Sequence, residues 1–115
     1  MKQKPFTAPQ LRALTANHTA NQAQGGGIDQ KPVVKFFCPW GAATWLITEF
    51  DGEDRMFGLC DLGHGSPELG YVSLGELKAL RGRFGMTIER DLHFTADMPL
   101  SGYVKQARED GCIRA

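Results

Sequence analysis

The sequence lacks the short motifs that most often identify an enzyme or a nucleotide-binding protein. It contains no Gly-x-Ser-x-Gly, no Walker A motif and no Gly-x-Gly-x-x-Gly, which are signatures of serine hydrolases, P-loop proteins and dinucleotide-binding folds. Aromatic residues make up 10% of the chain, and they are not interleaved with basic residues as on a surface that binds single-stranded nucleic acid. These absences favour a protein that is not an enzyme and has no cofactor.

Cysteine is also scarce. Cys38, Cys60 and Cys112 are an odd number at wide spacing, and without a Cys-x-x-Cys pair they indicate neither a zinc ribbon nor a redox-active dithiol. No apolar run approaches the roughly 20 residues needed to span a bilayer, and the opening MKQKPFTAPQLRAL lacks the apolar region of a signal peptide. We therefore expect a cytoplasmic protein with three free thiols and no membrane contact.

The formal net charge is zero, because the chain has 13 basic and 13 acidic side chains. The whole molecule therefore offers no electrostatic attraction to nucleic acid or to an anionic membrane. The charge is uneven along the chain, however, with five basic side chains against one acidic side chain in residues 1–35. In residues 49–76 the only basic residue is Arg55. The acidic residues of this stretch are Glu49, Asp51, Glu53, Asp54, Asp61, Glu68 and Glu76. This pattern fits two solvated stretches, or an acidic face that meets a basic partner.

Residues 1–30 are expected to form a helical appendage followed by a glycine-rich linker. In TAPQLRALTANHTANQAQ, Thr7 can cap a helix and Gln10 stands at the capping-box position. Leu11 and Leu14 share a face, but the apolar stripe is thin, and the glycines at 25–27 form a flexible break. The segment either packs on the core or reaches to a partner.

Residues 31–115 are expected to form an α+β core domain with a mostly antiparallel sheet of about four to five strands. Runs rich in strand-forming residues lie at 32–37, 43–50, 55–61, 68–74 and 86–94. The run ATWLITEF is apolar on both faces for most of its length, which predicts a central strand. The hairpin signal Asp51-Gly52 follows it, and Gly58 indicates a bulge or a close backbone approach.

Two further helices are expected in this core domain. Ser73 can cap an inserted helix, with Glu76 at the capping-box position. The buried stripe of that helix would consist of Leu74, Leu77 and Leu80. Residues 100–110 carry apolar side chains at helical spacing and predict a C-terminal helix that ends at Gly111.

Two groups of polar residues could hold a metal ion or perform acid–base chemistry. The first surrounds the loop LGHGSP and consists of Asp61, His64 and Glu68, because two carboxylates and an imidazole can bind a divalent ion. In the run 86–94, the residues Glu89, Asp91 and His93 share one face, about 6.5–7 Å apart. A metal-dependent hydrolase or nuclease would use Asp61, Glu68, Glu89, Asp91 and His93. The structural alternative gives Asp61 and Ser66 turn hydrogen bonds and leaves the second group facing solvent.

Arg90 is predicted to point toward the apolar side of the same strand. A buried arginine requires a carboxylate, and Glu49 and Glu68 are the candidates. We expect a structural ion pair, and a substrate-binding arginine is the alternative.

Three segments resemble a known bacterial family. PVVKFFCPWGAATWLITEFD, FGLCDLGHGSPELGYVSLGEL and IERDLHF are similar, in this order and spacing, to the family catalogued as domain of unknown function 2958. The resemblance covers residues 32–94 and extends to the helix at 100–110, with departures at HGS and in the short ending CIRA. It implies a small cytoplasmic protein, often encoded on plasmids, phages or integrated conjugative elements. It implies no established activity, cofactor or catalytic residue.

The leading hypothesis is a non-enzymatic protein-interaction module. By analogy with anti-restriction and anti-CRISPR proteins, it would act as a stoichiometric inhibitor or regulator of a host defence protein. Its partner-binding residues would be Glu49, Asp51, Glu53, Asp54, Asp61, His64 and Glu68, standing in for phosphates if the partner binds nucleic acid. A weaker alternative is nucleic-acid binding by the basic N-terminal arm. A dimer could form through an edge strand such as 33–37.

Overall fold

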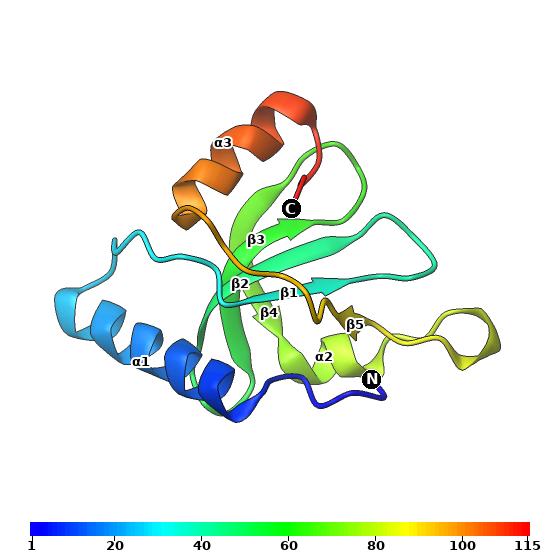
Figure 1. The fold of residues 1–115 in the computed structure, drawn as a ribbon, viewed down its shortest axis with the longest axis horizontal. Coiled ribbons are helices and arrows are strands. Elements are labelled where there is room, and N and C mark those ends of the chain that lie inside the picture. The colour runs from blue at the N-terminus through cyan, green and yellow to red at the C-terminus, as the bar shows by residue number, and fades with distance from the viewer.

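A five-stranded antiparallel sheet forms the centre of the computed structural model, which describes residues 1–115 (Figure 1). The strands lie in the order β4-β3-β2-β1-β5. In chain order the elements are α1 (Ala8–Gln24), β1 (Val34–Phe37), β2 (Thr44–Phe50), β3 (Arg55–Asp61), β4 (Glu68–Ser73), α2 (Leu74–Ala79), the 3₁₀ turn η1 (Arg83–Gly85), β5 (Glu89–Arg90) and α3 (Leu100–Asp110). The α+β class with N-terminal, inserted and C-terminal helices is confirmed.

The central strand is β2, as its two apolar faces predict. It pairs with β1 on one side and β3 on the other, and six of its seven residues are buried. The register with β3 shifts between Ile47 and Glu49, so the irregularity lies in β2, opposite Gly58. A Cβ atom at Gly58 would lie 1.9 Å from the carbonyl oxygen of Leu46. Glycine is therefore required there by a close approach of two backbones.

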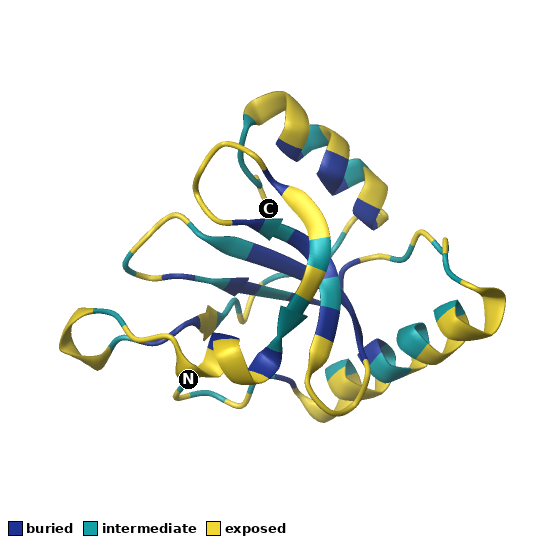
Figure 2. Ribbon diagram, turned by 180° about the vertical axis from the view of Figure 1, so that it is seen from behind, coloured by how far each residue is buried: buried dark blue, intermediate teal, exposed yellow.

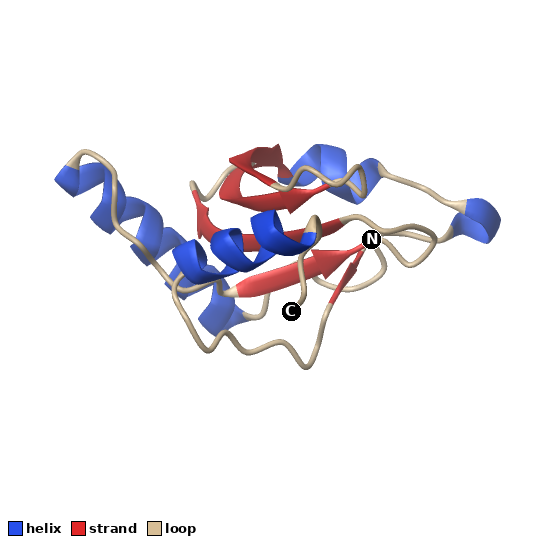
Figure 3. Ribbon diagram, turned by 90° about the horizontal axis from the view of Figure 1, so that it is seen from above, coloured by secondary structure: helices blue, strands red, loops and turns tan.

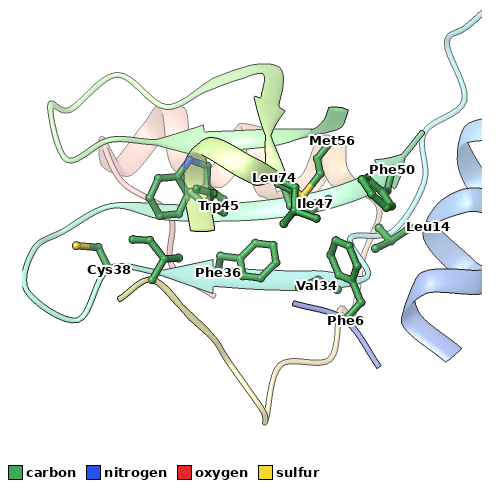
Figure 4. Packing of buried hydrophobic residues seen from close by; sticks show 12 residues of the cluster. Phe6, Leu14, Val34, Phe36, Cys38, Trp45, Ile47, Phe50, Met56 and Leu74 are labelled. Atoms are coloured by element: carbon green, nitrogen blue, oxygen red, sulfur yellow. The ribbon is translucent and has the colours of Figure 1, made fainter. Parts of the chain in front are cut away.

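One face of the sheet carries the larger hydrophobic core (Figure 4). Its buried side chains come from the N-terminal segment, α1, the strands and α2, and they include Phe6, Leu14, Val34, Phe36, Trp45, Ile47, Phe50, Met56, Leu74, Leu77 and Ile88. The Phe6 ring lies 5.2 Å from the Phe50 ring and 6.0 Å from the Phe36 ring, measured between centroids. Segments far apart in the chain therefore share one core.

Residues 1–30 pack on the sheet rather than reaching away from it. Thr7 and Gln10 form the predicted capping box, with each side chain accepting the other residue's backbone N–H. Leu14 is the one buried residue of α1 and is fully inaccessible. The Asn17 amide donates to the carbonyl of Thr48 at 2.9 Å, which fixes the helix to β2.

The opposite face of the sheet is covered by α3, whose buried stripe faces the strands in Figure 2. This second core consists of Leu46, Leu59, Leu100, Tyr103, Val104 and Ala107. The helical spacing read from residues 100–110 is thus confirmed, and the helix ends at Gly111 as predicted. None of the helices combines the length and apolar character that crossing a membrane would require.

Several local expectations were wrong. The strand expected over 86–94 is limited to β5, because the Asp91 side chain accepts the N–H of His93 at 2.8 Å and turns the chain. Leu80 follows the last residue of α2 and is exposed. Arg90 forms no ion pair with a glutamate and donates instead to the carbonyl of Lys4 at 2.6 Å. β1 lies between β2 and β5, which pairs with Phe36 and Phe37, so β1 is not an edge strand of the sheet.

Candidate functional site

The largest cavity is an open groove of about 760 Å³ on the α3 side of the sheet. One wall is the end of α1 with the following loop 26–30, the other wall is α3, and the floor is formed by β2, β3 and β4. Its apolar lining consists of Ile28, Phe57, Leu69, Tyr71, Leu100 and Val104. We refer to this cavity as the α1–α3 groove.

The floor of the groove is apolar and accessible. Leu69 is 45% exposed and Tyr71 is 67% exposed. The Tyr71 ring meets the Phe57 ring edge-on at 5.2 Å between centroids, and the guanidinium of Arg55 lies 5.1 Å from the Tyr71 centroid. Both contacts hold the tyrosine ring in place. Large exposed apolar side chains that line a groove are typical of a binding surface.

The groove opens onto a free edge of the sheet. β4 pairs with β3 alone, so the backbone groups on its other side have no strand partner. Figure 2 shows β4 in front, with exposed and half-buried residues along most of its length. Its sequence ELGYVS contains no proline or lysine, the residues with which proteins commonly protect an edge. The site therefore combines apolar side chains with an unpaired backbone.

The α1 wall is built around a buried carboxylate. Glu49 is 6% exposed, and its side chain accepts the Asn21 amide at 3.0 Å and lies 3.5 Å from Nδ1 of His18. Asn21 in turn accepts the N–H of Ile28 at 3.1 Å, which fixes the loop after α1. Gln30 donates to the carbonyl of Asn17, but its Oε1 atom is buried without a donor. This wall is a rigid hydrogen-bonded unit.

The α3 wall carries charge at its rim. Lys105 and Arg108 are exposed and belong to none of the three ion pairs. The Asp29 carboxylate already accepts two hydrogen bonds from Ser101, one from the backbone N–H and one from the hydroxyl group. The rim thus carries the cations Lys105 and Arg108 beside the carboxylates of Asp29 and Glu109.

Four of the six predicted acidic site residues accept hydrogen bonds within the fold. Glu49 and Asp61 are buried, and Asp61 accepts the N–H groups of Gly63 and Ile113 at 2.9 and 3.0 Å. Asp51 accepts three turn N–H groups, which lower its carboxyl pKa. Asp54 accepts the Ser73 hydroxyl and the Gly75 N–H, and these donors lower its pKa as well.

The remaining members of that predicted set are Glu53, His64 and Glu68, all exposed and without a side-chain hydrogen bond in the fold. They do not form one patch. Glu53 lies in the β2–β3 turn, whereas Glu68 pairs in register with Cys60 at the far end of the β3–β4 ladder. The acidic stretch of the sequence is thus spread over the molecule by the fold.

The predicted metal-ligand set does not converge. Glu68 lies on β4 and Glu89 on β5, which are the two opposite edges of the sheet. The Asp91 carboxylate accepts the His93 N–H, which lowers its pKa, and it also pairs with Lys35 at 3.3 Å. No group of three or more histidine, cysteine, aspartate or glutamate side chains has an arrangement that could hold a metal ion. The residues that the metal-dependent alternative requires are therefore not brought together.

The cysteines remain free, as expected. Burial raises the pKa of Cys60 to about 11, so this thiol stays protonated at neutral pH and is a weak nucleophile. Cys38 is buried in the larger core. Neither residue lies in the α1–α3 groove.

Sequence reasoning missed the residues that line the groove floor. The signal was present in ELGYVS, because alternation places Leu69 and Tyr71 on the same face of one strand. What the sequence could not indicate is that α3 leaves this face uncovered. That arrangement depends on where the helix crosses the sheet.

Comparison with known proteins gives a family without an assigned activity. The family model described as "Protein of unknown function (DUF2958)" matches residues 6–114. No curated protein and no solved structure matches the chain. The match includes α1, which precedes the segment 32–94 of the sequence resemblance, and α3 in full. Because it spans nearly the whole chain, the protein belongs to this family of unknown function, DUF2958.

Proposed function

We propose that this protein is a protein-binding module whose α1–α3 groove takes an extended segment of a partner, added to the sheet beside β4. The observation that carries the proposal is the coincidence of two features. An apolar groove of about 760 Å³ lies directly beside a strand edge with no partner. Strand addition uses both features at once, since the edge supplies main-chain hydrogen bonds and the groove supplies pockets for side chains.

The geometry of β4 specifies the segment it would accept. Leu69 and Tyr71 project from the same face of the strand, so an added strand would place every second side chain beside them. These alternate side chains should be apolar. The cations Lys105 and Arg108 at the rim stand beside the carboxylates of Asp29 and Glu109, so charge does not select the flanking residue. The proposed ligand is therefore an extended, alternating apolar peptide.

A binding module of this kind would act by occupancy, which agrees with the hypothesis of a stoichiometric inhibitor or regulator. The host-defence identity of the partner, the mobile-element origin and the cytoplasmic location stay predictions. The acidic residues Glu53 and Glu68 are exposed and remain available to a basic partner surface. They would contribute at the ends of β4 rather than as one patch.

The proposal can be tested by selecting peptides from a phage-displayed library of linear sequences on the full chain. We expect the selected peptides to alternate apolar residues and to protect β4 backbone amides from hydrogen exchange. The variant Tyr71→Asp should weaken their binding about tenfold or more, as for a central aromatic contact. Leu92→Asp is the matched control, because Leu92 is 66% exposed and Tyr71 is 67% exposed.

Two results would count against this function. The selection could return no alternating peptide, or the two variants could weaken binding equally. Protection of β4 amides separates strand addition from simple filling of the groove by side chains. Binding that depends on Tyr71 without any β4 protection would leave the groove as the site and eliminate the added strand.

A further inference from the structure

A second surface lies far from the groove, at the hairpin formed by residues 81–87. Arg81 pairs with Thr87, and the N–H of Gly82 donates to the carbonyl of Met86 at 2.7 Å. The turn η1 forms the tip of this hairpin, which projects at one end of the molecule while the end of α1 projects at the other (Figures 1 and 3). Whatever binds at this tip does not compete with the groove.

The tip presents an aromatic ring with almost no cover. Phe84 is 98% exposed, the highest value among the exposed large apolar residues. It is also the one non-glycine residue with a positive φ, at 58°, a conformation that L-residues with large side chains rarely adopt. A strained backbone that holds an apolar ring in water has no benefit for folding. Strain of this kind is often found at functional sites.

The base of the hairpin is held rigidly. A Cβ atom at Gly82 would lie 2.4 Å from the Trp40 ring, so the indole packs directly against the hairpin backbone. The ring of Phe84 is therefore displayed from a fixed support rather than from a loose loop.

Positive charge gathers along the hairpin, from its base to its tip. Arg81 and Arg83 flank the tip, and Lys78 lies one turn away in α2. The Met1 nitrogen donates to the carbonyl of Lys78 at 3.3 Å, which brings Lys2 to the same place. Partial desolvation, followed by the charges of Arg81, Lys78 and Lys2, lowers the pKa of the Met1 amino group. Arg81, Lys78 and Lys2 therefore gather around the Met1 amino group at the base of the hairpin, and Arg83 adjoins Phe84 at its tip.

The cations of this cluster have no carboxylate partners. None of Lys2, Lys78, Arg81 and Arg83 takes part in an ion pair. Glu76 and Glu89 are the carboxylates on the adjoining elements, and both are also unpaired. Four cations against two carboxylates leave the surface positive, although the whole chain is neutral. The sequence RGRFG contains this signal, because two arginines closely precede an aromatic residue there.

We propose that this hairpin binds single-stranded nucleic acid, with Phe84 stacking on an unpaired base and the four cations contacting phosphates. A polyanion with flat apolar rings is the ligand class that matches both features. A bare aromatic face binds bases of any sequence, and neighbouring lysine and arginine side chains follow the backbone. The stacking requires an unpaired base, which favours a single strand over a duplex.

The test is fluorescence anisotropy of the full chain with a labelled oligothymidylate of about twelve nucleotides, a length within the usual site sizes. We expect binding that weakens with salt, because each phosphate contact on a single strand contributes about −0.7 to the slope of log affinity against log salt. The double variant Arg81→Gln/Arg83→Gln should flatten that slope by about 1.4. The double variant Lys105→Gln/Arg108→Gln is the matched control and should bind as the natural chain does.

The ring is tested separately with Phe84→Gly, which suits the left-handed backbone at this position and therefore should fold. It should lose affinity about fivefold or more, the effect of one base–aromatic stack, without a change in the salt slope. Polyglutamate serves as a polyanion without rings. The proposal fails if the oligonucleotide does not bind, if Phe84→Gly binds it equally well, or if polyglutamate binds as tightly, which would indicate an acidic protein partner.

Discussion

At the scale of single residues, Gly58 is the position where the fold tolerates a side chain least. Its hypothetical Cβ atom would lie 1.9 Å from the Leu46 carbonyl oxygen and 2.9 Å from the Ile47 Cα atom. Both neighbours are backbone atoms of the central strand, so no side-chain rotation relieves the clash. We predict that Gly58→Ala lowers the free energy of unfolding by about 3 kcal/mol, the upper end of the range for overpacked cores. Urea denaturation of the purified chain measures this difference.

The matched control lies directly across the ladder, because Gly58 pairs in register with Gly70. A Cβ atom at Gly70 would meet nothing within 4 Å. Gly70→Ala should therefore be neutral, or stabilising by up to about 1 kcal/mol through the unfolded state. Equal effects at the two positions would show that the loss arises from strand propensity rather than from the close approach of the backbones.

At the scale of elements, Asp54 joins the β2–β3 turn to the start of α2. Its carboxylate accepts the Ser73 hydroxyl at 2.6 Å and the Gly75 N–H at 2.7 Å, while its carbonyl accepts the N–H of Leu74 at 2.8 Å. Ser73 also accepts the N–H of Glu76, as the sequence predicted for the helix cap. The turn and the helix are therefore expected to unfold together.

These donors lower the pKa of Asp54 below its ordinary value, the Ser73 hydroxyl first. A carboxyl group with a lowered folded pKa contributes stability above its unfolded pKa, and this stability is lost as the pH falls through the folded pKa. We predict that Asp54→Asn is less stable than the natural chain at neutral pH. The difference should narrow below about pH 4, near the unfolded pKa of aspartate. Thermal unfolding from pH 2 to pH 7 measures it.

Glu53→Gln is the control for this pH series. Glu53 is the exposed neighbour of Asp54, and its side chain accepts no hydrogen bond. The stability of this variant should follow that of the natural chain across the whole range. A constant difference between Asp54→Asn and the natural chain down to pH 2 would mean that the carboxylate charge is not what joins the turn to the helix.

Local sequence signals predicted most of these elements correctly. The capping box of Thr7 with Gln10, the N-cap at Ser73 and the doubly apolar run of β2 each depend on residues close together in the chain. The Glu76 side chain does not complete the second capping box. The errors arose where a tertiary contact decided the outcome. Arg90 is satisfied by a carbonyl of the N-terminal segment 86 residues away. No periodicity in its own strand could indicate that partner.

The candidate site was predictable only in part, for the same reason. Glu49 was placed in a binding surface because it begins the acidic stretch of the sequence, but Asn21 and His18 of α1 cover it. The α1–α3 groove is the space left between two helices that are about 75 residues apart in the chain, counted from Gln24 to Leu100. Its existence depends on helix placement across the sheet, which local patterns do not encode.

At the scale of the whole molecule, the division into an appendage and a core domain can be tested directly. Phe6 and Leu14 belong to the same buried cluster as Phe36 and Ile47 of the sheet. Truncation of a buried phenylalanine or leucine to alanine costs about 3–5 and 2–5 kcal/mol respectively. Losing both therefore removes about as much as the 5–15 kcal/mol by which whole domains are stable.

We predict that residues 31–115 alone do not fold cooperatively, although they contain every strand of the sheet. Deleting residues 1–30 removes both core side chains and also the Asn17 amide that donates to the Thr48 carbonyl. The fragment should show poorly dispersed amide proton chemical shifts in its proton–nitrogen NMR spectrum and no sharp thermal transition. A synthetic peptide of residues 1–30, added in excess, should restore the dispersed spectrum. The reason is that noncovalent contacts with the sheet hold α1 in place, and these do not require the covalent connection to residue 31. A fragment that unfolds sharply without the peptide would establish residues 31–115 as an independent domain and reduce α1 to an attachment.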